Sequence, residues 1–154
     1  MAVYSSDGSE ASNSHLARFE QIWYEAPICA AAMQSYHMAA ILLLVNQPQE
    51  STAVRSTVSL RLQAYRQGER EAILHARELC GTCLAGPPDP VRIHSVQALS
   101  VAGQVFEEPE DMQVVLELLE GIERDLGWTT FHHRSRLKDL LEGRKNGRLK
   151  WLFL

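Results

Sequence analysis

The chain has 154 residues, 45% of them hydrophobic and 22% charged, with a formal net charge of −4 and a pI near 5.8. This length fits one domain of ordinary globular composition. The acidic balance argues against generic nucleic-acid binding, which usually needs a basic domain with a pI above about 9. The 3 cysteines are too few for a disulfide framework and indicate a reducing compartment.

The N-terminal residues 1–13 are rich in serine, glycine and acidic side chains, so we expect them to be disordered. They lack the basic and apolar regions of a secretory signal, and the expected location is the nucleus or the cytoplasm. We expect one helical domain over 14–143. Its first element is a short helix over 15–24, which Ser14 can cap.

The stretch 27–45 contains no charged residue, and Pro27 suits the first turn of a helix. A helix that is apolar on all sides must be surrounded by other helices or by lipid. The polar residues 34–37 lie at its centre, where unsatisfied polar groups are costly in a bilayer. We therefore expect a buried central helix rather than a membrane span.

The remaining chain shows helical periodicity with clear breaks and no strict alternation of period two. Gly68 separates two of the patterns, and Gly127 can cap another at its C-terminal end. The predicted helices cover 54–66, 73–83, 91–105, 109–126 and 131–142. The predicted fold is all-α, a single helical domain of about six to seven helices around the buried central helix over 27–45. Residues 144–154, basic and then apolar, form a C-terminal tail.

Candidate metal ligands are few in this sequence. Cys80 and Cys83 have CxxC spacing, but a zinc site needs a second pair of ligands and a redox motif needs a preceding strand. Structural thiols are the favoured interpretation. Glu71 and His75 lie four residues apart on one predicted helix, and a solvated helix face is favoured over a metal pair. The sequence therefore predicts no metal, no cofactor and no catalytic residue.

Candidate ligand-binding residues are Tyr36, His37 and His94. His37 could donate to a ligand, although a hydrogen-bonded core histidine is the favoured interpretation. The basic face over 132–138 is explained by solvation, with an acidic partner surface as the alternative. The standard phosphate-binding, hydrolase and metalloprotease motifs do not occur in the sequence.

Several short segments show a family resemblance through their order and spacing. They are Trp23-Tyr24 before Ala26-Pro27, Tyr36–Ala39 before Ile41–Leu44, His75–Leu79, Pro90–Leu99 with Ala102-Gly103, Leu118-Leu119 with Ile122-Glu123, and Asp125–Thr130. Over 16–141 the chain resembles the C-terminal part of the fungal-specific transcription factor domain. That domain is the helical regulatory region of fungal binuclear zinc-cluster transcription factors.

The resemblance covers only the regulatory region. Family members bind DNA through an N-terminal cluster of six cysteines and two zinc ions, whereas this chain has 3 cysteines. The resemblance therefore implies no DNA contact, zinc ligand or catalytic residue here. It implies an effector-responsive regulatory domain, with a small-molecule effector or a protein as partner. We expect no specific nucleic-acid binding, because the chain is acidic and lacks the zinc cluster, and no membrane binding, because of the polar residues within 27–45.

Two alternatives to this regulatory role stay open. The first is a stand-alone helical protein, derived from that domain, that binds or converts a small metabolite. The second is a homo-oligomeric interaction module that associates through the apolar residues 151–154.

Overall fold

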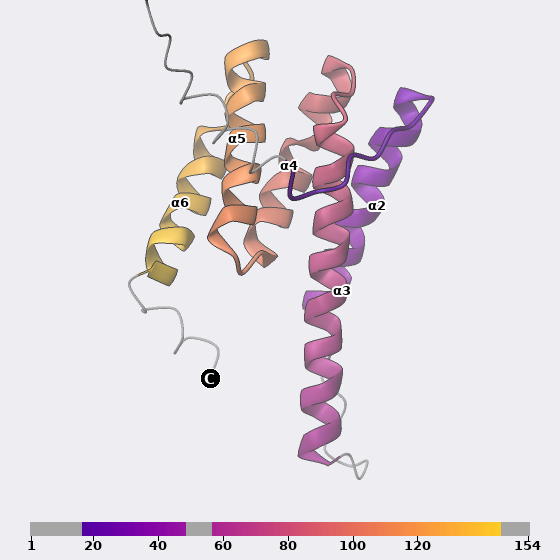
Figure 1. Ribbon diagram of the computed structural model, residues 1–154, viewed down its shortest axis with the longest axis vertical. Helices are drawn as coiled ribbons and strands as arrows, with labels where there is room; N and C mark the ends of the chain where they lie inside the picture. The colour runs from indigo at the N-terminus through magenta and orange to yellow at the C-terminus, as the bar shows by residue number, and fades with distance from the viewer. Residues whose placement is uncertain (1–16, 49–56, 146–154) are drawn as a thin grey trace, which may run out of the picture.

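The structure, a computed structural model, describes residues 17–48 and 57–145. Within these ranges the chain forms five α-helices and no strand, so the predicted all-α class is confirmed there (Figure 1). The predicted disorder over 1–13 and most of the predicted tail lie outside the described residues. The helices are α2 (Pro27–Val45), α3 (Val58–Leu84), α4 (Asp89–Val105), α5 (Pro109–Leu126) and α6 (Phe131–Lys145).

The helix at the centre of the packing is α4, which contacts each of the other four described helices (Figure 1). Its Leu99 is fully buried, as are Leu119 of α5 and Leu137 of α6. Gly103 allows α6 to approach α4 closely, since a Cβ there would lie 2.8 Å from a methyl carbon of Leu137. The hydrophobic core therefore forms around α4 and α5.

The prediction that 27–45 is the buried central helix is wrong. Helix α2 packs against α3 and α4 on one side only, and its buried residues are Ala30, Gln34, His37 and Ile41. Ile28 and Leu43, on other faces of α2, are 75% and 71% exposed. Among the described helices, α2 alone is long and apolar enough to cross a membrane, and 22% of that window is buried. The apolar composition of 27–45 predicted a helix correctly, but it did not predict how many other helices pack against it.

Helix α3 replaces the two shorter helices predicted over 54–66 and 73–83. It runs unbroken for 27 residues, and the side chain of Thr57 accepts a hydrogen bond from the backbone N–H of Leu60 at its start. Gly68 does not end it, since one glycine costs only about 1 kcal/mol in a helix interior. The N-terminal half of α3 projects beyond the other helices (Figure 1).

The prediction of a helix over 15–24 is wrong within the described residues, because residues 17–26 form a non-helical segment. The backbone N–H of Ile22 donates to the carbonyl of Gly81 on α3, at 3.1 Å. The absence of a side chain at Gly81 permits this approach, because a Cβ there would lie 2.2 Å from the carbonyl oxygen of Glu20. Tertiary contacts with α3 have replaced the local helical hydrogen bonds.

The same segment is anchored by Arg18 and Phe19. Phe19 is buried and its ring packs against Phe106, with centroids 5.5 Å apart. Arg18 and Arg77 both donate to the buried carboxylate of Asp111, at 2.7 and 2.8 Å. Two arginines satisfy this carboxylate, which would otherwise be costly to bury.

Of the two helix ends that the sequence assigned to a glycine, one is confirmed and one is wrong. Gly127 ends α5 in the left-handed conformation, with φ +67°, and its N–H donates to the carbonyl of Glu123, as predicted. Helix α6, in contrast, continues through Gly143 to Lys145. The side chain of Arg144 donates to the backbone carbonyls of Gln104 and Phe106, and these contacts hold the final turn against the rest of the fold.

Candidate functional site

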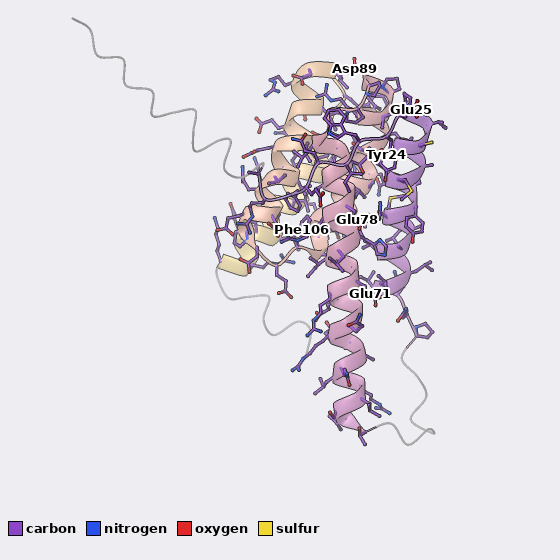
Figure 2. The ribbon with its side chains drawn as sticks, turned by 45° about the vertical axis from the view of Figure 1, so that its right-hand side comes forward. Tyr24, Glu25, Glu71, Glu78, Asp89 and Phe106 are labelled. Carbon is purple, nitrogen blue, oxygen red and sulfur yellow. The ribbon has the colours of Figure 1, made fainter. Side chains whose placement is uncertain are left out.

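A group of polar side chains lies between α2 and α3, which we call the histidine cluster: His37, His75 and Glu78. His37 lies on the inward face of α2, while His75 and Glu78 are three residues apart on α3 and so share one face of that helix. One ligand atom from each side chain can be chosen so that all lie within 4.8 Å of one another. Figure 2 labels Glu78 on α3, with Glu71 closer to the projecting end of that helix.

The two imidazoles of the histidine cluster face one another. The Nδ1 atoms of His37 and His75 are 3.0 Å apart, which is hydrogen-bond distance for a donor on one ring and an acceptor on the other. The Nε2 atom of His37 lies 3.4 Å from Oε2 of Glu78. The ring of Tyr36 meets both imidazoles edge-on, at centroid distances of 5.2 and 5.8 Å.

Burial differs sharply within the histidine cluster. His37 is 1% exposed, whereas the side chain of Glu78 is 56% exposed, so the cluster opens to solvent on the Glu78 side. Burial lowers the pKa of His37; the charge of Glu78 opposes this effect and His75 adds to it. His37 is therefore a neutral imidazole at neutral pH. Within residues 17–48 and 57–145, its buried Nε2 has no hydrogen-bond partner, despite the nearby carboxylate.

Of the three predicted ligand-binding residues, the fold brings Tyr36 and His37 together but not His94. His94 is exposed on α4, and its Nε2 lies 2.9 Å from Oγ of Ser35. Glu71 is exposed and accepts a hydrogen bond from Gln67, which fits the solvated helix face favoured from the sequence over a metal pair with His75. The residue of α3 that joins His75 in the histidine cluster is Glu78, which was not predicted from the sequence. The signal that could have found it is the three-residue spacing on one helix face.

The thiols of Cys80 and Cys83 belong to the packing between helices. Cys80 is fully buried, and burial raises its pKa well above the usual range. Burial likewise raises the pKa of Cys83 to about 12, although hydrogen bonds from Ser95 and Gln34 oppose the shift. Protonated thiols of this kind fit the structural interpretation favoured from the sequence.

The predicted basic face over 132–138 lies on α6 and is only partly free. Arg134 donates to the carboxylate of Glu123, at 2.8 Å, and the backbone N–H of Thr130 donates to the same oxygen, at 3.1 Å. His132, Arg136 and Lys138 are exposed. Part of this face therefore fastens the start of α6 to α5.

The histidine cluster has the donor set of a small polar binding site. Neutral imidazoles both donate and accept hydrogen bonds, and a carboxylate accepts them. The same atoms also coordinate transition-metal ions.

The chain is similar to part of the transcription activator AMTR1 of Alternaria alternata, with 37% identity over 130 residues. The match covers 84% of this chain and 17% of the activator, so the chain spans about a sixth of that relative. No family model matches the chain, and no solved structure matches it.

Proposed function

We propose that this chain is an effector-responsive regulatory region of a fungal transcription factor and does not itself bind DNA. The observation on which the proposal rests is the 37% identity to a transcription activator over 130 residues. A match to 17% of that activator supports a role as one region of a larger regulator. Its site of action is the nucleus.

The absence of DNA binding is supported by charge. The chain has a net charge of −4, whereas DNA binding requires lysine and arginine side chains that neutralise phosphates. Arg18, Arg77 and Arg134 are already paired with carboxylates of the same chain. These three arginines are therefore engaged within the fold and not free to contact the phosphate backbone.

The effector site in this proposal is the histidine cluster. It combines a buried imidazole of His37 with the solvent-accessible carboxylate of Glu78, and Tyr36 packs beside both rings of the pair His37 and His75. The buried Nε2 of His37, which has no hydrogen-bond partner among the described residues, is the atom that we expect a polar ligand to contact. Binding there would join α2 to α3 more firmly and so change the outer surface of the domain.

A fusion experiment tests the proposal. The chain is joined to a heterologous DNA-binding domain, and transcription from a reporter with the matching site is compared with that given by the DNA-binding domain alone. We expect the fusion to change reporter output. The matched control replaces Leu99, which is fully buried in α4, by aspartate; the resulting loss of the fold should abolish the effect.

DNA binding by the isolated chain is measured separately by fluorescence anisotropy. We expect only weak association that disappears as salt is raised to about 200 mM. Sequence-selective binding above that concentration would refute the proposal. So would a folded, well-expressed fusion whose reporter output equals that of the DNA-binding domain alone.

A second candidate function is a homo-oligomeric interaction module, favoured by the apolar surface of α2 and of the projecting half of α3. Its large side chains are between 43% and 76% exposed. Extended apolar surface of this kind is typical of association sites. The residues are Ile28, Leu42, Leu43, Val45, Val58, Leu60 and Leu62. The predicted contact through residues 151–154 lies outside the described residues.

Sedimentation velocity over a range of concentrations tests the second candidate. Leu43→Glu should shift an oligomer toward the monomer without unfolding it, because Leu43 is 71% exposed. Gln47→Glu adds the same charge at an exposed position just beyond α2 and should leave the mass unchanged. A parent chain that is monomeric at every concentration would exclude this candidate.

A further inference from the structure

We infer that the histidine cluster binds a divalent transition-metal ion, with His37, His75 and Glu78 as protein ligands and zinc as the best-suited ion. The sequence predicted no metal, because neither Cys80 with Cys83 nor Glu71 with His75 had a second pair of ligands. The fold supplies a different set, because His37 comes from α2 and meets two side chains of α3.

The distances suit an ion. Zinc–nitrogen and zinc–oxygen bonds of about 2.0–2.1 Å in tetrahedral geometry place neighbouring ligand atoms about 3.3 Å apart. The Nε2 of His37 and Oε2 of Glu78 are 3.4 Å apart, close to that separation. The widest separation in the ligand set is 4.8 Å. His75 is half-buried and Glu78 is exposed, so their side chains can rotate to shorten this separation. The side chain of His37 is held in place by burial.

A second, independent observation points to a ligand at this position. The Nε2 of His37 is buried and has no hydrogen-bond partner among the described residues. Buried polar atoms are nearly always paired in folded proteins, because an unpaired one loses the hydrogen bond it made to water. An ion bound at Nε2 would satisfy this atom and use Glu78 to balance the charge.

The donor chemistry selects the class of ion. Two imidazoles and one carboxylate suit zinc, copper and nickel, whereas magnesium and calcium prefer oxygen donors alone. Three protein ligands leave a fourth position of a tetrahedral site. That position faces the solvent-accessible side of the histidine cluster, at Glu78, and is available to water or to an anionic or nitrogen-containing small molecule.

The experiment uses the full chain without an affinity tag, stripped of metal with a chelator. Zinc is titrated by calorimetry, and cobalt is used as a spectroscopic probe of the same site. We expect saturable binding of a single ion and visible cobalt absorption of a low-coordinate nitrogen and oxygen site. Zinc should also raise the melting temperature, because it binds the folded chain preferentially.

Two variants remove ligands, and two matched variants serve as controls. Glu78→Gln and His75→Asn should each weaken zinc binding by at least about tenfold. Loss of a residue that only hydrogen-bonds to a ligand already costs about that much affinity, so loss of a ligand itself should cost no less. Glu71→Gln changes another carboxylate of α3, and His94→Asn changes a histidine outside the cluster; both should bind as the parent does. Circular dichroism verifies that each variant is folded. Because Glu78 is exposed, Glu78→Gln should stay folded, and it tests metal binding even if His75→Asn unfolds.

Three results would overturn the inference. The first is a parent chain that binds neither zinc nor cobalt saturably. The second is a folded Glu78→Gln variant with unchanged affinity. The third is an intense near-ultraviolet thiolate-to-cobalt band that Cys83→Ser removes, because it would place the ion at the thiols of α3 instead.

Discussion

At the scale of single residues, the inward face of α2 is polar at its centre. Gln34 and His37 are 0% and 1% exposed, whereas Leu43 on the same helix is 71% exposed. Gln34 lies 3.6 Å from Sγ of Cys83, and His37 contacts His75. Each of these contacts requires α2 to keep its present register against α3, since a shift would leave buried polar groups unpaired.

The three cysteines should differ in reactivity. Cys29 is exposed, Cys83 is half-buried and Cys80 is buried, and burial raises the pKa values of both Cys80 and Cys83. An alkylating reagent applied to the native chain at about pH 8, near the pKa of a free thiol, should therefore modify Cys29 first. Peptide mapping by mass spectrometry measures the three rates. Equal modification of Cys83 and Cys29 would show that α3 does not bury its thiols, and unfolding in urea should make all three react.

Of the three residues of the histidine cluster, only His37 was predicted from the sequence as a ligand-binding residue, together with Tyr36 beside it. Tyr36 and His37 were identifiable as polar side chains inside an apolar stretch. His75 was considered, but with Glu71, which bonds to Gln67 instead. The pairing of two helices decides which side chains meet, and that pairing depends on packing across the whole domain rather than on any local pattern.

At the scale of elements, two glycines of α3 should respond oppositely to alanine. A Cβ at Gly68 would meet no atom within 4 Å, so Gly68→Ala should stabilise the fold by about 0.5–1 kcal/mol. A Cβ at Gly81 would lie 2.2 Å from the carbonyl oxygen of Glu20. Gly81→Ala should therefore destabilise by about 1–3 kcal/mol, as overpacking does. Urea denaturation of both variants measures the difference, and a stabilised Gly81→Ala would contradict the placement of residues 17–26 against α3.

The junction of α5 and α6 should depend on pH through Glu123. Hydrogen bonds from Thr130, side chain first and then backbone, hold the pKa of Glu123 below its usual range, and Arg134 adds to the effect. A lowered pKa in the folded state stabilises the fold above the unfolded pKa, and this stability is lost as pH falls through the folded value. Glu123→Gln should thus lower the melting temperature at pH 7, with a deficit that shrinks toward about pH 3.

Scanning calorimetry of the parent and Glu123→Gln across this range measures the deficit. The control is Glu117→Gln, which changes a glutamate of α5 whose partner is Gln113 on the same helix. A deficit that stays constant with pH would show that the carboxylate charge of Glu123 is not responsible.

The sequence predicted some helices better than others for a physical reason. Helices α4 and α5 have local signals at their ends, namely a proline in the first turn of each and Gly127 after α5. Residues 17–26 have a helical pattern, yet their contacts with α3 and α5 outweigh it. The position of α2 at the edge likewise depends on which helices pack together, and apolar composition does not encode this.

At the scale of the whole molecule, the domain is asymmetric. The core joins α4, α5 and α6 with the C-terminal half of α3, and Phe106 from the loop after α4 is fully buried in it. The outer face of α2 exposes large apolar side chains, and so does the projecting half of α3, where they alternate with charged ones. A stable core beside an exposed apolar surface suits a regulatory region that meets a partner or further parts of a longer protein.

The proposed function requires these helices to act on transcription within a protein that binds DNA elsewhere. The most direct test replaces the matched segment of the Alternaria activator with the matching 130 residues of this chain and measures transcription of a reporter that the activator drives. We expect the chimera to retain activation well above that of an activator lacking the segment, and Leu99→Asp in the chimera should abolish this activation by disrupting α4. A chimera that is folded and normally expressed, yet no more active than the deletion, would contradict the account.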